Sequence, residues 1–152
     1  MAKPILVLNG PNLNMLGVRE PAVYGRDSLE DVRRLAENRA QALGLALEFR
    51  QTNHEGELVG WIQEARNTAS GIIVNAGALT HTSIAILDAL QAAELPVIEV
   101  HLSNIFRREA FRQHSYVSLA ANGVICGLGA KGYALALEAM ADILSKKSVT
   151  TG

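Results

Sequence analysis

A short apolar segment at residues 96–104 ends in polar side chains that could transfer protons. Pro96 opens this run, and Glu99, His101 and Ser103 follow at alternate positions. Side chains alternate along a strand, so Glu99 and His101 lie on one face, where the carboxylate can fix the imidazole tautomer and favour its protonated form. The pair therefore suggests a proton donor or acceptor. A histidine that only caps the loop after a strand would give the same local pattern.

The rest of the chain alternates between short apolar runs and amphipathic stretches, which indicates strands alternating with helices. The predicted strands are 4–8, 45–50, 71–74, the run from Pro96, and 123–126. The predicted helices start at Ser28, at Asn53, after 80–83, and at about Lys131, the last one ending near Lys147. Ser28 and Asp31 form a plausible helix cap, Asn53 is expected to cap the second helix, and Gly44 to stop the first.

Strands that alternate with helices imply a parallel sheet with helices on both faces, because right-handed crossovers need covering layers. We predict an α/β, flavodoxin-like three-layer fold with a five-stranded parallel sheet in the order 2-1-3-4-5. The segment 45–50 alternates apolar and polar residues, so we expect it at an edge of the sheet.

Polar residues follow the ends of three predicted strands, and in a parallel sheet these ends meet at one edge. They are Asn12, Asn75, His81, His101 and Ser103. Ligands bind at this edge in open α/β sheets, near the point where the strand order reverses. We therefore expect these residues, which are scattered through the chain, to form one site.

The segment from Leu13 to Arg26 shows no clean periodicity. It contains Gly17 and Gly25 as candidate hinges and Arg19 and Tyr24 as functional side chains. A mobile lid at about 17–26 is one interpretation. An ordinary surface loop is the other.

Length and composition point to one domain without a nucleic-acid or membrane partner. The chain has 152 residues and a net charge of -1, which gives no electrostatic reason to bind nucleic acid. No apolar run approaches the roughly 20 residues that span a bilayer, and there is no secretory apolar region near the N-terminus.

Cys126 is the only cysteine, which fits a reducing cytoplasm. We expect a single catalytic domain over 1–147 and a flexible polar tail over 148–152.

Several common site types are disfavoured by the sequence. Residues 127–132 spell G-x-G-x-x-G, but no strand with an acidic residue follows, so a tight turn is a better interpretation than a dinucleotide site. A nucleophilic-serine elbow is absent, and the four histidines lack zinc-ligand spacing. Only Lys131 among the lysines follows a strand end, which disfavours an imine mechanism. Arginines 19, 107, 108 and 112 suggest an anionic substrate, although a solvated helix face would look similar.

Five ordered blocks of the sequence together resemble the type II 3-dehydroquinate dehydratases. They are Asn9–Asn14, Arg19–Gly25, Asn75–Ser83, Glu99–Asn104 and Arg108–Arg112, and Gly127-Leu128-Gly129 extends the match. The resemblance implies a flavodoxin-like domain that dehydrates 3-dehydroquinate to 3-dehydroshikimate, in aromatic biosynthesis or quinate catabolism, without cofactor or metal. It also implies a homododecamer, a tetramer of trimers.

The resemblance also implies roles for individual residues. Tyr24 matches the proton-abstracting tyrosine, Arg19 the lid arginine, and His101 the proton-donating histidine, with Glu99 behind it. Asn12 matches the asparagine that holds a water near the enolate oxygen. The expected substrate contacts are Asn75, His81, Ser103, Arg112 and the backbone of Leu102, while Asp88 would reach a neighbouring subunit's site. Leu87 stands where many members carry an arginine beside this acid, and Leu79 replaces a frequent aromatic residue.

This reaction would need a strong base near neutral pH. Free tyrosine titrates near pH 10, so working at about pH 7 requires roughly 4 kcal/mol of stabilisation of the phenolate. One guanidinium at about 4 Å supplies around that much at an effective dielectric constant of about 20. We therefore hypothesise that lid closure, which brings Arg19 to Tyr24 and excludes water, activates the base, with Arg108 as a second cation.

Two other functions are consistent with the same elements. One is a binding module for a nucleotide or another small molecule, which would bind a dinucleotide or flavin tightly and leave 3-dehydroquinate unchanged. The other is a related lyase that acts on a different cyclic polyol acid, which substrate competition would reveal.

Overall fold

The computed structural model describes the backbone of residues 2–151 and the side chains of residues 2–147. The strands are β1 (Ile5–Asn9), β2 (Leu47–Gln51), β3 (Gly71–Asn75), β4 (Val97–His101) and β5 (Gly123–Cys126). The helices are α1 (Pro21–Tyr24), α2 (Leu29–Ala42), α3 (Glu55–Thr68), α4 (Ile84–Ala93) and α5 (Lys131–Thr151).

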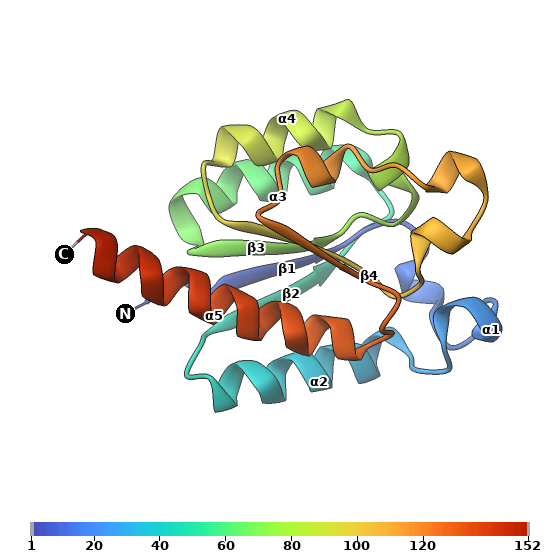
Figure 1. The fold of residues 1–152 in the computed structure, drawn as a ribbon, viewed down its shortest axis with the longest axis horizontal. Coiled ribbons are helices and arrows are strands. Elements are labelled where there is room, and N and C mark those ends of the chain that lie inside the picture. The colour runs from blue at the N-terminus through green and yellow to red at the C-terminus, as the bar shows by residue number, and fades with distance from the viewer. Residues whose placement is uncertain (1, 152) are drawn as a thin grey trace.

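All five strands are parallel and form one sheet in the order β2-β1-β3-β4-β5. Helices α3 and α4 cover one face of this sheet, and α2 and α5 cover the other (Figure 1). The predicted α/β class, strand order and edge position of the second strand are therefore confirmed.

The alternation of apolar side chains along the inner strands fills both layers. Ile5 and Val7 of β1 pack with α2 and α5, whereas Leu6 and Leu8 pack with α3 and α4. All four side chains are buried, as expected for a strand between two helical layers. The two apolar clusters make the sheet a rigid base whose carboxyl ends carry the polar residues.

The starts of α3 and β2 differ from the predicted ones. The α2 cap at Ser28 and Asp31 is a reciprocal capping box as predicted, but α3 is preceded by His54. The predicted cap, Asn53, instead accepts a hydrogen bond from the Asn12 amide at 3.0 Å. Strand β2 starts at Leu47 because the Leu45 amide closes the end of α2 on the Ala40 carbonyl at 2.8 Å.

The last helix is longer than predicted, and its backbone is helical to Thr151. The side chains of 148–151 and all of Gly152 lie outside the described residues, so the flexibility of the 148–152 tail stays a prediction. Within the described residues, no helix is both long and apolar enough to cross a bilayer.

Candidate active site

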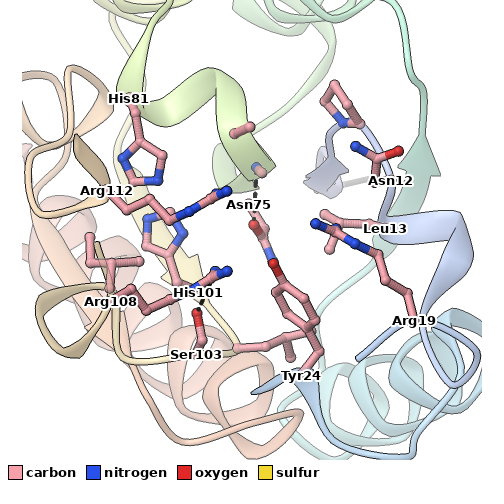
Figure 2. Close-up of a pocket in the computed structure, with 15 residues that line it drawn as sticks. Asn12, Leu13, Arg19, Tyr24, Asn75, His81, His101, Ser103, Arg108 and Arg112 are labelled. Atoms are coloured by element: carbon pink, nitrogen blue, oxygen red, sulfur yellow. Dashed lines mark hydrogen bonds between the residues drawn. The ribbon is translucent and has the colours of Figure 1, made fainter. Parts of the chain in front are cut away.

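A cavity of about 200 Å³ opens at the carboxyl ends of β1, β3 and β4, where the topology predicts the ligand site. Two histidines, three arginines, two asparagines and one tyrosine provide most of its polar surface (Figure 2). Its lining residues are Pro11, Asn12, Leu13, Arg19, Tyr24, Asn75, Gly77, Ala78, His81, His101, Leu102, Ser103, Ile105, Arg108 and Arg112.

Nine of the eleven residues predicted for the site line this cavity. Glu99 does not, because it is fully buried beneath His101. Asp88 is exposed on α4 and is not part of the cavity of its own chain. Its contact with a neighbouring subunit stays a prediction.

The side chains of Glu99 and His101 are hydrogen-bonded to each other through the His101 Nε2 atom. Both side chains are buried, and strand alternation places them on the same face of β4, as predicted. Burial opposes ionisation of Glu99, but the hydrogen bond and the positive charge of His101, with further hydrogen bonds from Ser118 and Ser115, outweigh it and hold the pKa of this carboxyl below its usual range. Glu99 therefore acts as a fixed negative charge behind the imidazole.

The segment predicted as a lid brings Tyr24 against two arginines. The guanidinium carbon of Arg19 lies 5.0 Å from the centre of the Tyr24 ring, and that of Arg108 lies 5.1 Å from it. Figure 2 shows Arg19 reaching the cavity from one side, and His101 and Arg112 from the other, with Tyr24 between them. The ring of Tyr24, on the short helix α1, thus has two guanidinium groups against it.

Close backbone contacts fix the two loops that carry Asn12 and Asn75. The Gly10 amide donates to the Asn75 carbonyl at 2.8 Å, and a Cβ on Gly10 would lie only 2.3 Å from the Ala76 oxygen. Asn12 adopts a left-handed conformation with φ of 70°, which asparagine tolerates better than most residues. Glycine at position 10 is therefore required for the two loops to meet.

The buried hydroxyl of Tyr133 is hydrogen-bonded to the side-chain amide of Asn75. This hydroxyl accepts a hydrogen bond from Asn75 Nδ2 at 3.0 Å and donates one to Asn9 Oδ1 at 2.6 Å. Asn75 Oδ1 accepts from the Gly77 amide at 3.2 Å. Burial raises the pKa of Tyr133 far above its usual range, so its hydroxyl stays neutral. The orientation of the Asn75 side chain is therefore defined on both ends of its amide.

His81 and Arg112 form the wall opposite the lid. The His81 Nδ1 atom lies 2.7 Å from the His114 carbonyl, and the His114 Nε2 atom lies 3.0 Å from the His81 carbonyl. Burial, together with the charges of His101 and Arg112, lowers the pKa of His81. His81 therefore favours the neutral form, which can hydrogen-bond a substrate hydroxyl. Arg112 remains the cation on this side.

The glycines at 127 and 129 shape the exit of β4. Both have positive φ angles, 86° and 61°, and their amides donate to the carbonyls of His101 and Leu102 at 3.2 and 3.1 Å. The G-x-G-x-x-G pattern is thus the predicted tight turn, and its backbone supports the residues that follow the acid.

The sequence does not predict the full role of four residues near the site. Arg108 was considered only as a second cation, yet its guanidinium lies as near the Tyr24 ring as that of Arg19 does. Thr80, Ser115 and Ser118 were missed, although their hydroxyls surround Glu99. Residues 113–120 carry no strand or helix periodicity, so nothing in the sequence pointed to Ser115 and Ser118. Only the threonine beside His81 offered a local signal.

The arrangement offers proton transfer between two groups of opposite character on an anionic substrate. A phenol near two guanidinium groups can serve as a base, and an imidazole backed by a carboxylate can serve as an acid. No group of three or more histidine, cysteine, aspartate or glutamate side chains with metal-site geometry occurs among the described residues.

Comparison with known proteins gives one consistent result. The family model described as dehydroquinase class II matches residues 3–141. The chain is 60% identical over 144 residues to 3-dehydroquinate dehydratase 2 of Pseudomonas putida, covering 95% of this chain and 97% of the relative. It is 59% identical to the 3-dehydroquinate dehydratase of Phenylobacterium zucineum, with 94% and 99% covered. The crystal structure of a type II dehydroquinase from Propionibacterium acnes superposes with a TM-score of 0.89 at 48% identity, covering 93% of this chain and 98% of that one.

Proposed function

The chain belongs to the class II dehydroquinase family and is a 3-dehydroquinate dehydratase, and we propose that it removes water by an anti elimination through an enolate. The product of this reaction is 3-dehydroshikimate. The observation that carries the proposal is that Tyr24 and His101, a candidate base and a candidate acid, line the same cavity.

Tyr24 is the base that removes the proton next to the substrate ketone. Two guanidinium groups about 5 Å from its ring, those of Arg19 and Arg108, stabilise the phenolate relative to the phenol. The proton moves from the substrate carbon to the phenolate oxygen, and the electron pair moves onto the ketone oxygen. Asn12, at the cavity wall, holds a water close to that enolate oxygen.

His101 is the acid that protonates the departing hydroxyl. Its Nε2 atom is engaged by Glu99, so Nδ1 is the nitrogen that serves the substrate. When the enolate collapses, the carbon–oxygen bond breaks and the hydroxyl leaves as water with the His101 proton. Tyr24 and His101 approach from different walls of the cavity (Figure 2), which supports an anti geometry.

The substrate carboxylate binds at the start of the turn after β4. The backbone amides of Leu102 and Ser103 belong to the turn between β4 and Ile105–Arg107, and successive backbone amides in a turn can bind an anion. Arg112 adds a positive charge at the same side. Asn75 and His81 hydrogen-bond the ring hydroxyls, while the carboxamide of Asn75 is oriented by Tyr133.

The lid acts by holding the Arg19 guanidinium against Tyr24, where its positive charge stabilises the phenolate. Arg19 is 39% exposed in its side chain, so closure would remove much of the water that screens its charge. Arg19→Lys keeps the charge but loses the planar fork. We expect lower turnover and a shifted pH profile for this variant. Full turnover with an unchanged profile would exclude activation by the lid.

A direct assay tests the proposed function. The protein is incubated with 3-dehydroquinate, and formation of the conjugated enone product is followed with time. Tyr24→Phe and His101→Ala should each lower kcat by at least about 100-fold, the usual loss of a general acid or base. Matched controls are Tyr116→Phe and His54→Ala, which change residues that do not line the cavity and should keep the wild-type rate. Near-normal turnover by Tyr24→Phe or His101→Ala would exclude the assigned role.

The two alternative functions are outcomes of the same assay. A nucleotide-binding module would bind a dinucleotide or flavin and form no enone product. A lyase for another cyclic polyol acid would turn that compound over faster than 3-dehydroquinate in a competition experiment.

The assembly belongs to the same proposal. We propose a homododecamer, a tetramer of trimers, in which Asp88 reaches the site of a neighbouring subunit. The exposed position of Asp88 on α4 and the exposed apolar side chain of Ile84 on the same helix support a contact there. Light scattering should show a dodecamer for the wild-type protein and for Asp88→Asn. A separate assay should show a lower kcat for Asp88→Asn. A fully active monomer would exclude a shared site.

We also propose a cytoplasmic location and one catalytic domain. The lone Cys126 is free, as is common in a reducing compartment. Fractionation of the source cells tests the location.

A further inference from the structure

Three hydroxyl side chains surround the Glu99 carboxylate on the side away from the cavity. Ser118 donates to Oε1, and Ser115 donates to Oε2 at 2.7 Å. Thr80 lies 3.2 Å from Oε2 and 2.8 Å from the Ser115 hydroxyl. These three residues, which we call the hydroxyl cluster, are not part of the cavity lining. All three hydroxyls lie within hydrogen-bond distance of the Glu99 carboxylate.

The hydrogen-bond geometry fixes the direction of the Ser115 proton. Its oxygen accepts from the Ser118 amide at 3.3 Å. The Thr80 hydroxyl is nearer to Ser115 than to Glu99, so Thr80 is best placed to donate to Ser115. With both acceptor positions of Ser115 used, its single proton points to Glu99. Oε2 thus receives Ser115 and His101, and Oε1 receives Ser118.

We propose that Thr80, Ser115 and Ser118 are positioning residues for the acid, which keep the proton shared by Glu99 and His101 on the imidazole. Hydrogen bonds to a carboxylate stabilise its charged form and lower its proton affinity. Without the hydrogen bonds that end on Glu99, the Nε2 proton of His101 would move to the buried carboxylate. The imidazole would then be neutral, and its Nδ1 proton would be a weaker acid toward the substrate hydroxyl. This inference rests on the proposed role of His101.

Most of the charged groups around His101 are positive, so the charge state of Glu99 matters for the imidazole. The groups that face it are Glu99 on β4, His81 from Gly77–His81, Arg112 from Ala110–Arg112, Arg108 from the preceding turn, and Arg19 and Tyr24 from the lid. None of the described cavity-lining residues is a carboxylate. Glu20 pairs with Arg19, and Glu109 pairs with Arg108 and Arg112, from outside the lining. Glu99 is the carboxylate that contacts His101 itself, so its charge state bears directly on the acid.

Kinetic measurements on single variants test the proposal. Ser118→Ala and Ser115→Ala should each lower kcat by about 10- to 100-fold, the rate equivalent of one hydrogen bond to a charged group. The features of the pH profile that report the Glu99–His101 pair should move to higher pH by about one unit, because the carboxylate gains proton affinity. Ser70→Ala removes a hydroxyl that donates to the Lys3 carbonyl far from the site, and it should keep the wild-type rate and profile.

A matched pair at position 80 separates the hydroxyl from packing. Thr80→Val keeps the shape and loses the hydroxyl, whereas Thr80→Ser keeps the hydroxyl and loses a methyl group. The proposal expects the profile to move for Thr80→Val and not for Thr80→Ser. A profile that moves for Thr80→Ser and not for Thr80→Val would overturn the proposal. This pair also serves if either serine variant does not fold.

A double mutant and a spectroscopic signal complete the test. In a Glu99→Gln background, Ser118→Ala should have little further effect on kcat, whereas an equal loss in both backgrounds would overturn the proposal. The nitrogen NMR signal of labelled His101, measured without substrate, should move toward the neutral ring in Ser118→Ala. An unchanged signal and pH profile would also overturn it. If the wild-type protein leaves 3-dehydroquinate unchanged, the proposed function fails, while the NMR signal still tests the hydroxyl cluster.

Discussion

Arg108 holds its guanidinium carbon 5.1 Å from the centre of the Tyr24 ring, with only 16% of its side chain exposed. Its Nη1 atom lies 3.4 Å from the Ser103 hydroxyl, which ties the arginine to the turn after β4. Arg19 is equally close to the ring but is 39% exposed. Since solvent screens an exposed charge more, Arg108 is the more effective of the two charges.

The first prediction is that Arg108→Gln lowers kcat by about 100-fold. A unit charge at about 5 Å contributes on the order of 3 kcal/mol at an effective dielectric constant of about 20, which corresponds to that change in rate. Arg107→Gln is the matched control, since this neighbouring arginine is exposed and does not line the cavity. Equal losses in both variants would contradict the assignment.

The second prediction concerns stability in acid. The pKa of Glu99 is lowered on folding, so the carboxylate contributes stability that is fully present above its unfolded pKa, near 4.3. This contribution is lost as the pH falls through the lower folded pKa. Glu99→Gln should therefore flatten the acid dependence of the free energy of unfolding, measured by urea titration between about pH 3 and pH 7.

Glu30→Gln is the control for this measurement. A hydrogen bond from Arg33 lowers the pKa of Glu30, but this carboxyl is fully exposed. Its contribution should vanish in about 0.5 M salt, whereas that of Glu99 should persist, because salt screens buried pairs much less. An acid dependence that salt removes entirely would show that Glu99 contributes nothing.

The third prediction concerns the contact between the loops after β1 and β3. Gly10→Ala would place a Cβ 2.3 Å from the Ala76 oxygen, so one loop must shift at a cost of about 1–3 kcal/mol. Asn12 and Asn75 should move apart, which raises KM as well as lowering stability. Gly60→Ala is the control, because its Cβ would have no neighbour within 4 Å. Alanine is the better helix former, so this variant should be as stable as wild type or more so.

The sequence supports the fold and much of the site because both depend on local patterns. Apolar runs alternating with amphipathic stretches predict a parallel sheet, and such a sheet brings Asn12, Asn75 and His101 to one edge whatever lies between them. The cap at Ser28 follows from its spacing to Asp31. The contact between Asn53 and Asn12 does not follow from local spacing. It joins two loops that meet only because β1 and β2 pair side by side in the sheet.

The unpredicted part of the site is its buried support. Ser115 and Ser118 lie in a segment without periodicity, which reaches Glu99 only because the Tyr116 amide donates to the Thr80 carbonyl at 2.8 Å and Val117 enters the core. Tyr133 resembles any other core residue of a helix in the sequence. Tertiary contacts alone give these hydroxyl groups their partners.

The fourth prediction is that Tyr133→Phe weakens both stability and substrate binding. The change leaves the ring in place but removes the donor to Asn9 and the acceptor of the Asn75 amide, and Tyr133 is only 1% exposed. Two buried polar groups lose a partner, at a cost of about 1–3 kcal/mol for each group left unsatisfied. Because the proposed role of Asn75 is to contact the substrate rather than the transferred protons, KM should rise several-fold more than kcat falls. The Phe49 ring packs against Tyr133, with 6.3 Å between the two ring centres. Phe49→Leu changes this packing and leaves the Tyr133 hydroxyl in place. A KM change of equal size in that variant would show that the Tyr133 hydroxyl does not orient Asn75.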